Sequence, residues 1–475
     1  MKKVMLSAAA LMIGAVTFAQ VSPTTPTASQ VVNPNLAQSP NANTVETDQW
    51  GTDQRLQVNQ VGERNSARVT QYNDLGNDNN EASISQAGPN GFYGLGQSFA
   101  DDNVAEAIQQ GGQNETSLIQ SGLRNNALSE QGTGYGHSDG NRVNITQGAG
   151  DYAQEFAVPS TSLSEDNFAY ALQNGDDNSA MISQDHDNND AATDQDGDDN
   201  AVQITQTSTR LFAADGHLAD VEQDGDSNEA KVVQDGNGGS NEAYTTQEGA
   251  YNDAYQTQTA EGAGSAVNVA TIEQLNSYNA DAYQSQDGEG NNATISQEGG
   301  EWYFDYDSNY AEQWQDGDNN TASITQDFDS NNGPWPPAES DNYAKQFQFG
   351  DGNEAIIDQD GEGNKAYQKQ WGDDNYITSE QDGHSNKLAA YQWNDDNYAI
   401  TQQTGSENHG LINQTDGQYA DLYQNGNGNS ANIFQAGPGG GSFLGCSFGP
   451  QLDIPNPDYV DPITVSDPCA TGNCN

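Results

Sequence analysis

Residues 353–407 read NEAIIDQDGEG NKAYQKQWGDD NYITSEQDGHS NKLAAYQWNDD NYAITQQTGSE, with spaces added to show a period of 11. An Asn opens each unit, at 353, 364, 375, 386 and 397, and a Gln follows six places later, at 359, 370, 381, 392 and 403. A strict repeat of fixed length is typical of architectures built from stacked copies of one structural unit.

Each unit alternates two kinds of residue. With the Asn counted as position 0, small or apolar residues fall at positions 2 and 4 and Gln at position 6, as in Asn178, Ala180, Ile182 and Gln184. These positions share one face of a β-strand, and Glu, Lys, Ser, Thr, Tyr or Asp fill the other face. Four residues such as DGDD or DGEG follow, and Gly, Asp and Asn accept the positive φ of a tight turn. Each unit therefore predicts a strand of about seven residues and a reversal of the chain.

Two other structures are compatible with parts of this pattern. Repeats of 11 residues also describe right-handed helical coiled coils, but a Gly in nearly every unit would cost a helix about 1 kcal/mol each time. High net charge with low hydrophobicity is typical of disorder, but the fixed period argues against it. We predict an all-β chain: a β-solenoid of strand–turn–strand rungs, about 22 residues and two units per rung, with amyloid-like cross-β stacking.

Stacked rungs place Asn over Asn and Gln over Gln. A side-chain amide is both donor and acceptor, so aligned copies can hydrogen-bond along the stack. Asn also opens strands after turns for local reasons, but this does not explain Gln at position 6. The predicted structural ladder comprises Asn178, Gln184, Asn189, Gln195, Asn200, Gln206, Asn228, Gln234, Asn353, Gln359, Asn364, Gln370, Asn375, Gln381, Asn386, Gln392, Asn397, Gln403, Asn408 and Gln414.

The repeat array fills most of the chain. The position-6 Gln recurs in about 29 units from Gln60 to Gln435, which indicates an array over residues 51–435. Insertions after Gln86, over 148–166, after Gln297 and after Gln326 are expected to be loops.

The segments outside the array have different compositions. Lys2 and Lys3 precede an apolar run from Val4 to Phe18, so residues 1–19 resemble a secretory signal peptide. Residues 20–50, rich in Pro, Thr, Ser and Asn, are expected to form a flexible leader, and residues 436–475 a Gly- and Pro-rich tail with cysteines.

The charge limits the possible partners. The formal net charge is −57, and about −59 once Lys2 and Lys3 leave with the signal peptide. This argues against binding to nucleic acid or anionic membranes and favours cations or cationic surfaces. No later segment approaches the roughly 18 to 20 apolar residues of a membrane helix, so we expect a secreted chain without membrane insertion.

The string Q-x-G-x-x-N-x-A-x-x-x-Q resembles the repeat of curlins, the subunits of bacterial curli fibres. It is present as Gln223, Gly225, Asn228, Ala230 and Gln234, and again as Gln195, Gly197, Asn200 and Gln206. The resemblance covers roughly residues 54–435. It implies a secreted functional amyloid that passes a dedicated outer-membrane channel with chaperones and polymerises, with other curlin-like subunits, into adhesive biofilm fibres. This chain has more repeats, more acidic residues and a cysteine-containing tail, so major subunit, nucleator and accessory protein all stay open.

Aspartates concentrate in the turns, for example in residues 196–200 and 224–228. Stacked like charges about 4.8 Å apart cost on the order of 1 kcal/mol per pair in water, so the turns are hypothesised to delay polymerisation until salt, low pH or a divalent cation neutralises them. Asp194, Asp196 and Asp198 have the oxygen-rich spacing of a calcium loop. Because the complete calcium-loop patterns are missing, we expect weak Ca²⁺ binding at most, with solvated turns as the alternative.

No sequence motif indicates catalysis, and we expect no enzyme and no other cofactor. The histidines at 137, 186, 217, 384 and 409 lack metal-ligand spacing and are expected to be solvated. The pairing of Cys446, Cys469 and Cys474 is open, and loop aromatics at 302, 303, 304, 306 and 335 are candidates for contacting a partner. The alternative function is a monomeric secreted β-solenoid that binds cations, or a surface or glycan, along one face.

Overall fold

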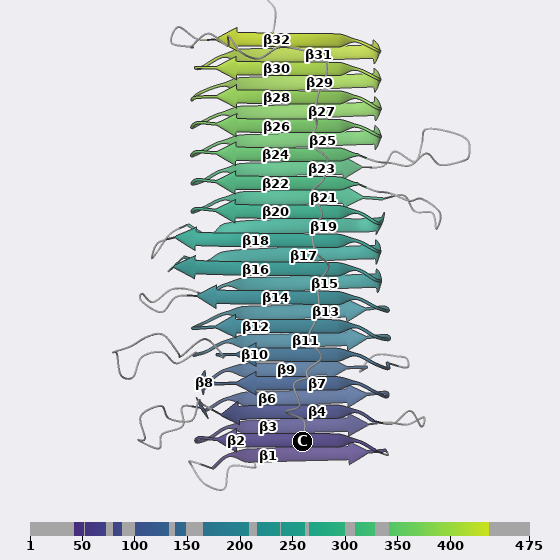
Figure 1. The fold of residues 1–475 in the computed structure, drawn as a ribbon, viewed down its shortest axis with the longest axis vertical. Coiled ribbons are helices and arrows are strands. Elements are labelled where there is room, and N and C mark those ends of the chain that lie inside the picture. Colours follow the sequence, from purple (N-terminus) through teal and green to yellow (C-terminus); the bar gives the residue numbers. More distant parts are fainter. Residues whose placement is uncertain are drawn as a thin grey trace, which may run out of the picture.

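The computed structural model describes residues 42–51, 53–72, 79–87, 100–132, 138–148, 165–208, 216–237, 239–261, 266–299, 309–327 and 342–436. All of their regular elements are strands, and none of these residues forms a helix long and apolar enough to cross a membrane. The predicted all-β solenoid is confirmed (Figure 1). The predicted signal peptide, the tail, its cysteines, the loop aromatics, His137 and most of the insertions lie outside the described residues.

Two parallel sheets of 15 strands form the body. Sheet A contains, in spatial order, β1 (Thr44–Trp50), β3 (Ser66–Tyr72), β6 (Val104–Gln110), β9 (Asn126–Gln131), β11 (Phe168–Asn174), β13 (Asp190–Asp196), β15 (Leu218–Asp226), β17 (Asn241–Ala250), β19 (Asn268–Tyr278), β21 (Asn292–Glu298), β23 (Thr321–Asp327), β25 (Glu354–Glu362), β27 (Tyr376–His384), β29 (Tyr398–Ser406) and β31 (Tyr419–Asn427). Sheet B contains β2 (Arg55–Val61), β4 (Glu81–Ala87), β7 (Glu115–Gln120), β10 (Arg142–Gln147), β12 (Ser179–Asp185), β14 (Ala201–Ser208), β16 (Glu229–Asn237), β18 (Asp253–Glu261), β20 (Asp281–Asp287), β22 (Tyr310–Asp316), β24 (Tyr343–Phe349), β26 (Lys365–Trp371), β28 (Lys387–Trp393), β30 (His409–Thr415) and β32 (Ser430–Ala436). A separate pair joins β5 (Ala100–Asp101) to β8 (Gly122–Leu123).

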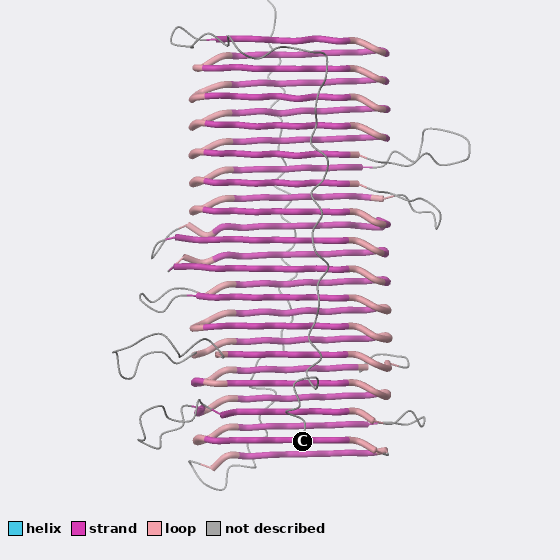
Figure 2. Tube along the Cα trace, in the orientation of Figure 1, coloured by secondary structure: helices cyan, strands magenta, loops and turns pink. Residues whose placement is uncertain are grey.

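Each rung is one strand of sheet A, a turn and one strand of sheet B, and turns line both edges of the stack (Figure 2). Glu354 pairs with Tyr376, and Tyr376 pairs with Tyr398, which confirms a rung of about 22 residues where no insertion occurs. Insertions lengthen the connection without changing register, because Gln131 and Gln173, 42 residues apart, still pair. A shift by one residue would turn every buried side chain outward.

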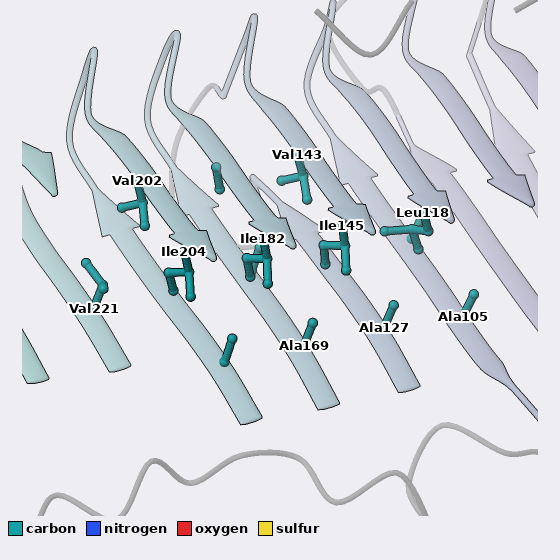
Figure 3. Packing of buried hydrophobic residues seen from close by; sticks show 14 of the residues in the cluster. Ala105, Leu118, Ala127, Val143, Ile145, Ala169, Ile182, Val202, Ile204 and Val221 are labelled. Carbon is teal, nitrogen blue, oxygen red and sulfur yellow. The ribbon is translucent and has the colours of Figure 1, made fainter. Parts of the chain in front are cut away.

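Positions 2 and 4 fill the space between the sheets. Ile145, Ile182 and Ile204 lie in a row along sheet B with no exposed surface, and Ala127 and Ala169 belong to the same core (Figure 3). Burial of one such Ile contributes about 1.5 to 3 kcal/mol. Alanines at position 2 let the two sheets approach closely, so a chain that is only 33% hydrophobic still builds a dry core.

The array begins before the predicted boundary at residue 51. The sequence predicts a flexible leader over residues 20–50, whereas β1 is a strand of that segment. Its unit has Asn43, Val45, Thr47 and Gln49 at positions 0, 2, 4 and 6. The repeat pattern expects an apolar residue at position 4, and this unit has a polar Thr there next to a Pro- and Thr-rich segment. The pattern therefore does not identify the unit.

The turns explain the glycine of the repeat. Gly225 has a φ of 122°, and a Cβ at this position would overlap the carbonyl oxygen of Gly249 in the next rung. Asp199, two places after the equivalent Gly197, has a φ of 59°, which Asp and Asn tolerate. Stacking therefore excludes side chains at the first of these positions only.

We expect Gly225→Ala to destabilise the solenoid by about 3 kcal/mol or more, because a disfavoured φ adds to a backbone overlap between rungs. Gly417→Ala is the matched control: Gly417 has a φ of 69°, and no atom of the described residues beyond its chain neighbours lies within 4 Å of the added Cβ. It should cost only about 1 kcal/mol. Thermal unfolding and hydrogen exchange of β15 and β17 measure both effects, and equal losses would contradict the stacking explanation.

Candidate functional site

Two ladders of glutamine amides run through the whole stack, one in each sheet at position 6. At each step Nε2 of one Gln donates to Oε1 of the Gln in the next rung, as from Gln184 to Gln206 at 2.9 Å and from Gln359 to Gln381 at 2.8 Å. The sheet A ladder links Gln49, Gln71, Gln109, Gln131, Gln173, Gln195, Gln223, Gln247, Gln274, Gln297, Gln326, Gln359, Gln381, Gln403 and Gln424. The sheet B ladder links Gln60, Gln86, Gln120, Gln147, Gln184, Gln206, Gln234, Gln258, Gln286, Gln315, Gln348, Gln370, Gln392, Gln414 and Gln435.

Each ladder also ties the two sheets together. The Nε2 of Gln184 donates a second hydrogen bond, of 2.7 Å, to the backbone carbonyl of Phe168 in the facing sheet. Gln206 does the same to Asp190 at 2.8 Å. Both N–H groups of a buried amide are thus satisfied, which removes the cost of about 1 to 3 kcal/mol for an unpaired buried donor.

The asparagines at position 0 bond mainly to backbone. Oδ1 of Asn178 accepts the backbone N–H of Asn200 at 3.0 Å, and Nδ2 of Asn200 donates to the carbonyl of Gly225 in the next turn at 2.6 Å. Some direct amide contacts occur as well, such as Asn397 Nδ2 to Asn375 Oδ1 at 2.9 Å. All twenty residues of the predicted ladder are at most 1% exposed. The Asn rows therefore fix the turns, while the Gln rows link side chains.

His217 takes the place of an Asn. It is 1% exposed, not solvated as the sequence suggested. Its Nε2 lies 3.1 Å from the carbonyl of Thr207 and therefore carries the proton, so Nδ1 accepts the backbone N–H of Asn241 at 3.2 Å. Burial lowers the pKa of His217, which keeps the ring neutral in this role.

A third ladder, which the repeat pattern does not reveal, lies at the centre of the core. Gln256, Gln284, Gln313, Gln346 and Gln368 occupy position 4 in five successive strands of sheet B, where most units have Ile, Leu or Val. Their amides bond in sequence at 2.9 to 3.1 Å. Each also donates to a carbonyl of the facing sheet. Units with Gln at both position 4 and position 6, such as Tyr343–Phe349, are the sequence signal that could have identified this ladder.

Gln313→Leu should destabilise the fold by about 2 to 4 kcal/mol, because Gln284 loses its acceptor and Gln346 its donor inside a dry core. Leu at all five positions should cost less than the single change, since both partners of each central bond then disappear together. Urea unfolding of the two variants measures which of them loses more stability. A single substitution that is harmless would mean that water reaches the ladder.

The turn aspartates have structural partners. Oδ1 of Asp198 accepts the backbone N–H of Asp176 at 2.8 Å, and Asp198 in turn donates its N–H to Asp226 at 3.0 Å. Asp318, Asp351, Asp373 and Asp395 repeat the arrangement. Asp194 and Asp196 lie on β13 instead, and no group of three or more potential metal ligands occurs within the described ranges. The structure therefore does not gather the predicted Asp194, Asp196 and Asp198 into a calcium site.

The most perturbed carboxylates lie on the outer strand faces, not in the turns. Burial raises the pKa of Asp194 to about 6, with Glu222 of the next strand adding to the shift. Burial likewise raises the pKa of Asp253 to about 7, helped by Asp281 and Glu229 in the same row. Stacking supplies the charged neighbours, because Asp194 pairs in register with Glu222, and Asp253 with Glu229 and Asp281, each more than 20 residues away in the sequence.

The solenoid should be more stable at pH 5 than at pH 7.5. Because the folded-state pKa values of Asp194 and Asp253 exceed the usual 3.8, the folded chain binds more protons than the unfolded chain between about pH 4 and 7, so stability falls as pH rises through this window. Urea midpoints across this range measure the slope. Asp194→Asn with Asp253→Asn should flatten it, and an unchanged slope in this double variant would contradict the assignment.

Comparison with known families supports this architecture. Residues 175–207 and 350–383 match the model of the curlin associated repeat family. The chain carries curlin repeats. This repeat family is structural, not enzymatic, and is associated with extracellular fibres. A comparison with curated proteins gives no match. The curlin segments contain β12, β13, β25 and β26 in full, so they contribute directly to both glutamine ladders.

Proposed function

We propose that this protein is a structural subunit of extracellular curli-like fibres and that it grows by end-to-end stacking of rungs. The proposal includes secretion through an outer-membrane channel with chaperones, co-assembly with other curlin-like subunits, and a role in adhesion and the biofilm matrix. Its support is the curlin repeat, together with the state of the two end rungs.

The ends of the ladders carry the proposal. At one end, Gln49 and Gln60 donate to the next rung, and no described residue donates to their Oε1 atoms. At the other end, Gln424 and Gln435 accept from the preceding rung, and each Nε2 has only a backbone partner among the described residues. The stack is thus polar, with acceptors at one end and donors at the other.

The side chains of the two ends also fit. The core residues Ala431, Ile433 and Gln435 of β32 would lie over Leu56, Val58 and Gln60 of β2, in the same order as within the stack. Ile433 and Val58 are only half-buried, whereas position-4 residues inside the stack are fully buried. Joining two molecules head to tail would bury this apolar surface and extend both ladders.

Mature wild-type protein should form unbranched fibres with reflections at about 4.8 and 10 Å. Ile433→Asp should abolish them, because it places a charge in the joint. Asn432→Asp, which adds the same charge on the outer face of the same strand, is the control and should assemble normally. Electron microscopy and fibre diffraction report the outcome.

A second measurement tests polarity. Ile433→Asp keeps an intact β1–β2 end, so it should add to one end of wild-type seeds and then block growth there at substoichiometric amounts, as followed by thioflavin fluorescence. Wild-type protein that stays monomeric under all conditions would overturn the proposed function and favour a monomeric solenoid that binds along one face.

A further inference from the structure

The lysines of the mature chain all lie on one face. Beyond Lys3 the sequence has five lysines, and every one lies in sheet B: Lys231, Lys345, Lys365, Lys369 and Lys387. Four of them occur in the successive strands β24, β26 and β28. In a chain with a net charge of −57, such a concentration of cations is a distinct surface.

This surface, which we call the basic aromatic patch, consists of Lys365, Lys369, Trp371, Lys387 and Trp393. The rings of Trp371 and Trp393 stack at 5.9 Å, and Trp371 is 51% exposed. Lys369 Nζ lies 5.4 Å from the Trp371 ring centroid. Lys365 and Lys387 are register partners, and neither has a carboxylate within salt-bridge distance among the described residues. Two adjacent cations thus lack compensation.

The same rungs carry the opposite charge on sheet A. Asp358, Asp360, Glu380 and Asp382, here called the acidic strip, are exposed on β25 and β27. Asp360 pairs in register with Asp382, and Asp358 with Glu380. Each rung therefore presents cations on one flat face and carboxylates on the other.

The register between the two sheets determines what a second copy would bring together. Position 4 lies opposite position 4, as in the 3.0 Å bond from Thr245 to Gln256, and position 6 opposite position 2, as for Gln109 and Thr116 at 3.2 Å. The position numbers of two residues that face each other across the sheets therefore sum to eight. The strands of each sheet all run in one direction along the stack (Figure 1), so a copy displaced perpendicular to the sheets follows the same rule on its outer faces.

We propose that two solenoids associate side by side, with the basic aromatic patch of one against the acidic strip of a second copy. Lys365 and Lys387, at position 1, then meet Asp360 and Asp382, at position 7. In the same placement Trp393 of β28, at position 7, meets Tyr376 at position 1 of β27, and Trp371 of β26 meets Glu354 at position 1 of β25. The charged rows therefore match in both rungs, an aromatic contact forms in one of them, and one rung spacing is common to both faces.

The other face pairings are unfavourable. Sheet B against sheet B would leave the lysine rows without carboxylates, and sheet A against sheet A would oppose two acidic strips. Because both faces belong to every chain, the contact repeats without limit across a fibre. It does not require end-to-end growth, so its failure is separable from that of the proposed function.

The test is Lys365→Glu with Lys387→Glu. Lateral pairing of filaments, measured as width and mass per length by electron microscopy, should fall by about tenfold or more, because attractive pairs become repulsive, while the elongation rate in thioflavin assays stays unchanged. The matched control is Arg142→Glu. This residue occupies the same row of sheet B, far from either end of the stack, but Gly132 lies at the facing position, so pairing should persist.

A charge exchange makes the test independent of folding defects. Asp360→Lys with Asp382→Lys should also lose pairing alone, and a mixture of the two double variants should regain it. Loss of pairing in the arginine control, or no rescue in the mixture, would overturn the proposal. So would wild-type filaments that remain single yet bind polygalacturonate in co-sedimentation through Lys365 and Lys387, which would assign the patch to an anionic polysaccharide.

Discussion

The hydrogen bond between glutamine amides of successive rungs is the interaction on which the rest of this structure depends. A primary amide is donor and acceptor together, so one bond geometry can repeat indefinitely along an axis, which a carboxylate or an ammonium group alone cannot do. A register slip would leave buried amides unpaired at a cost of about 1 to 3 kcal/mol each. With 15 strands in each sheet, the penalty multiplies, and the register becomes fixed along the whole stack.

A fixed register turns every outer position into a row of stacked residues, with opposite consequences for different chemistries. Rows of aromatic residues stabilise the stack, as for Tyr376, Tyr398 and Tyr419, whose ring centroids stack at 4.5 and 5.4 Å. Rows of carboxylates destabilise the stack, because each carboxylate is partly desolvated and held beside others. Burial and the nearby Glu222 raise the pKa of Asp220 to about 6 in this way. The glutamine ladders therefore hold together carboxylate rows that would otherwise repel each other. The buried register thus determines which residues lie side by side on the surface.

The sequence predicts the fold well because its period is local. Spacing within one unit, such as Asn353 to Gln359, defines a strand face, and the glycines define the turns. Features that arise between rungs are less visible. Asp253 and Asp281 are 28 residues apart, and only the exact register places one over the other. The row from Gln256 to Gln368 was missed because a polar residue at position 4 contradicts the expected pattern, and only five aligned copies make it favourable.

The end rungs differ from the interior in a way that bears on assembly. The outer residues of β2 and β32 include no carboxylate: they are Arg55, Gln57, Asn59 and Val61 at one end, and Ser430, Asn432, Phe434 and Ala436 at the other. Interior rungs tolerate acidic rows because the chain connects them covalently, whereas a joint between molecules must also overcome the entropy of association. On sheet A, Asp421 would lie over Glu46, so repulsion is confined to one half of the joint. Sheet B ends free of carboxylates thus lower the barrier to addition at the point where no covalent link holds the rungs together.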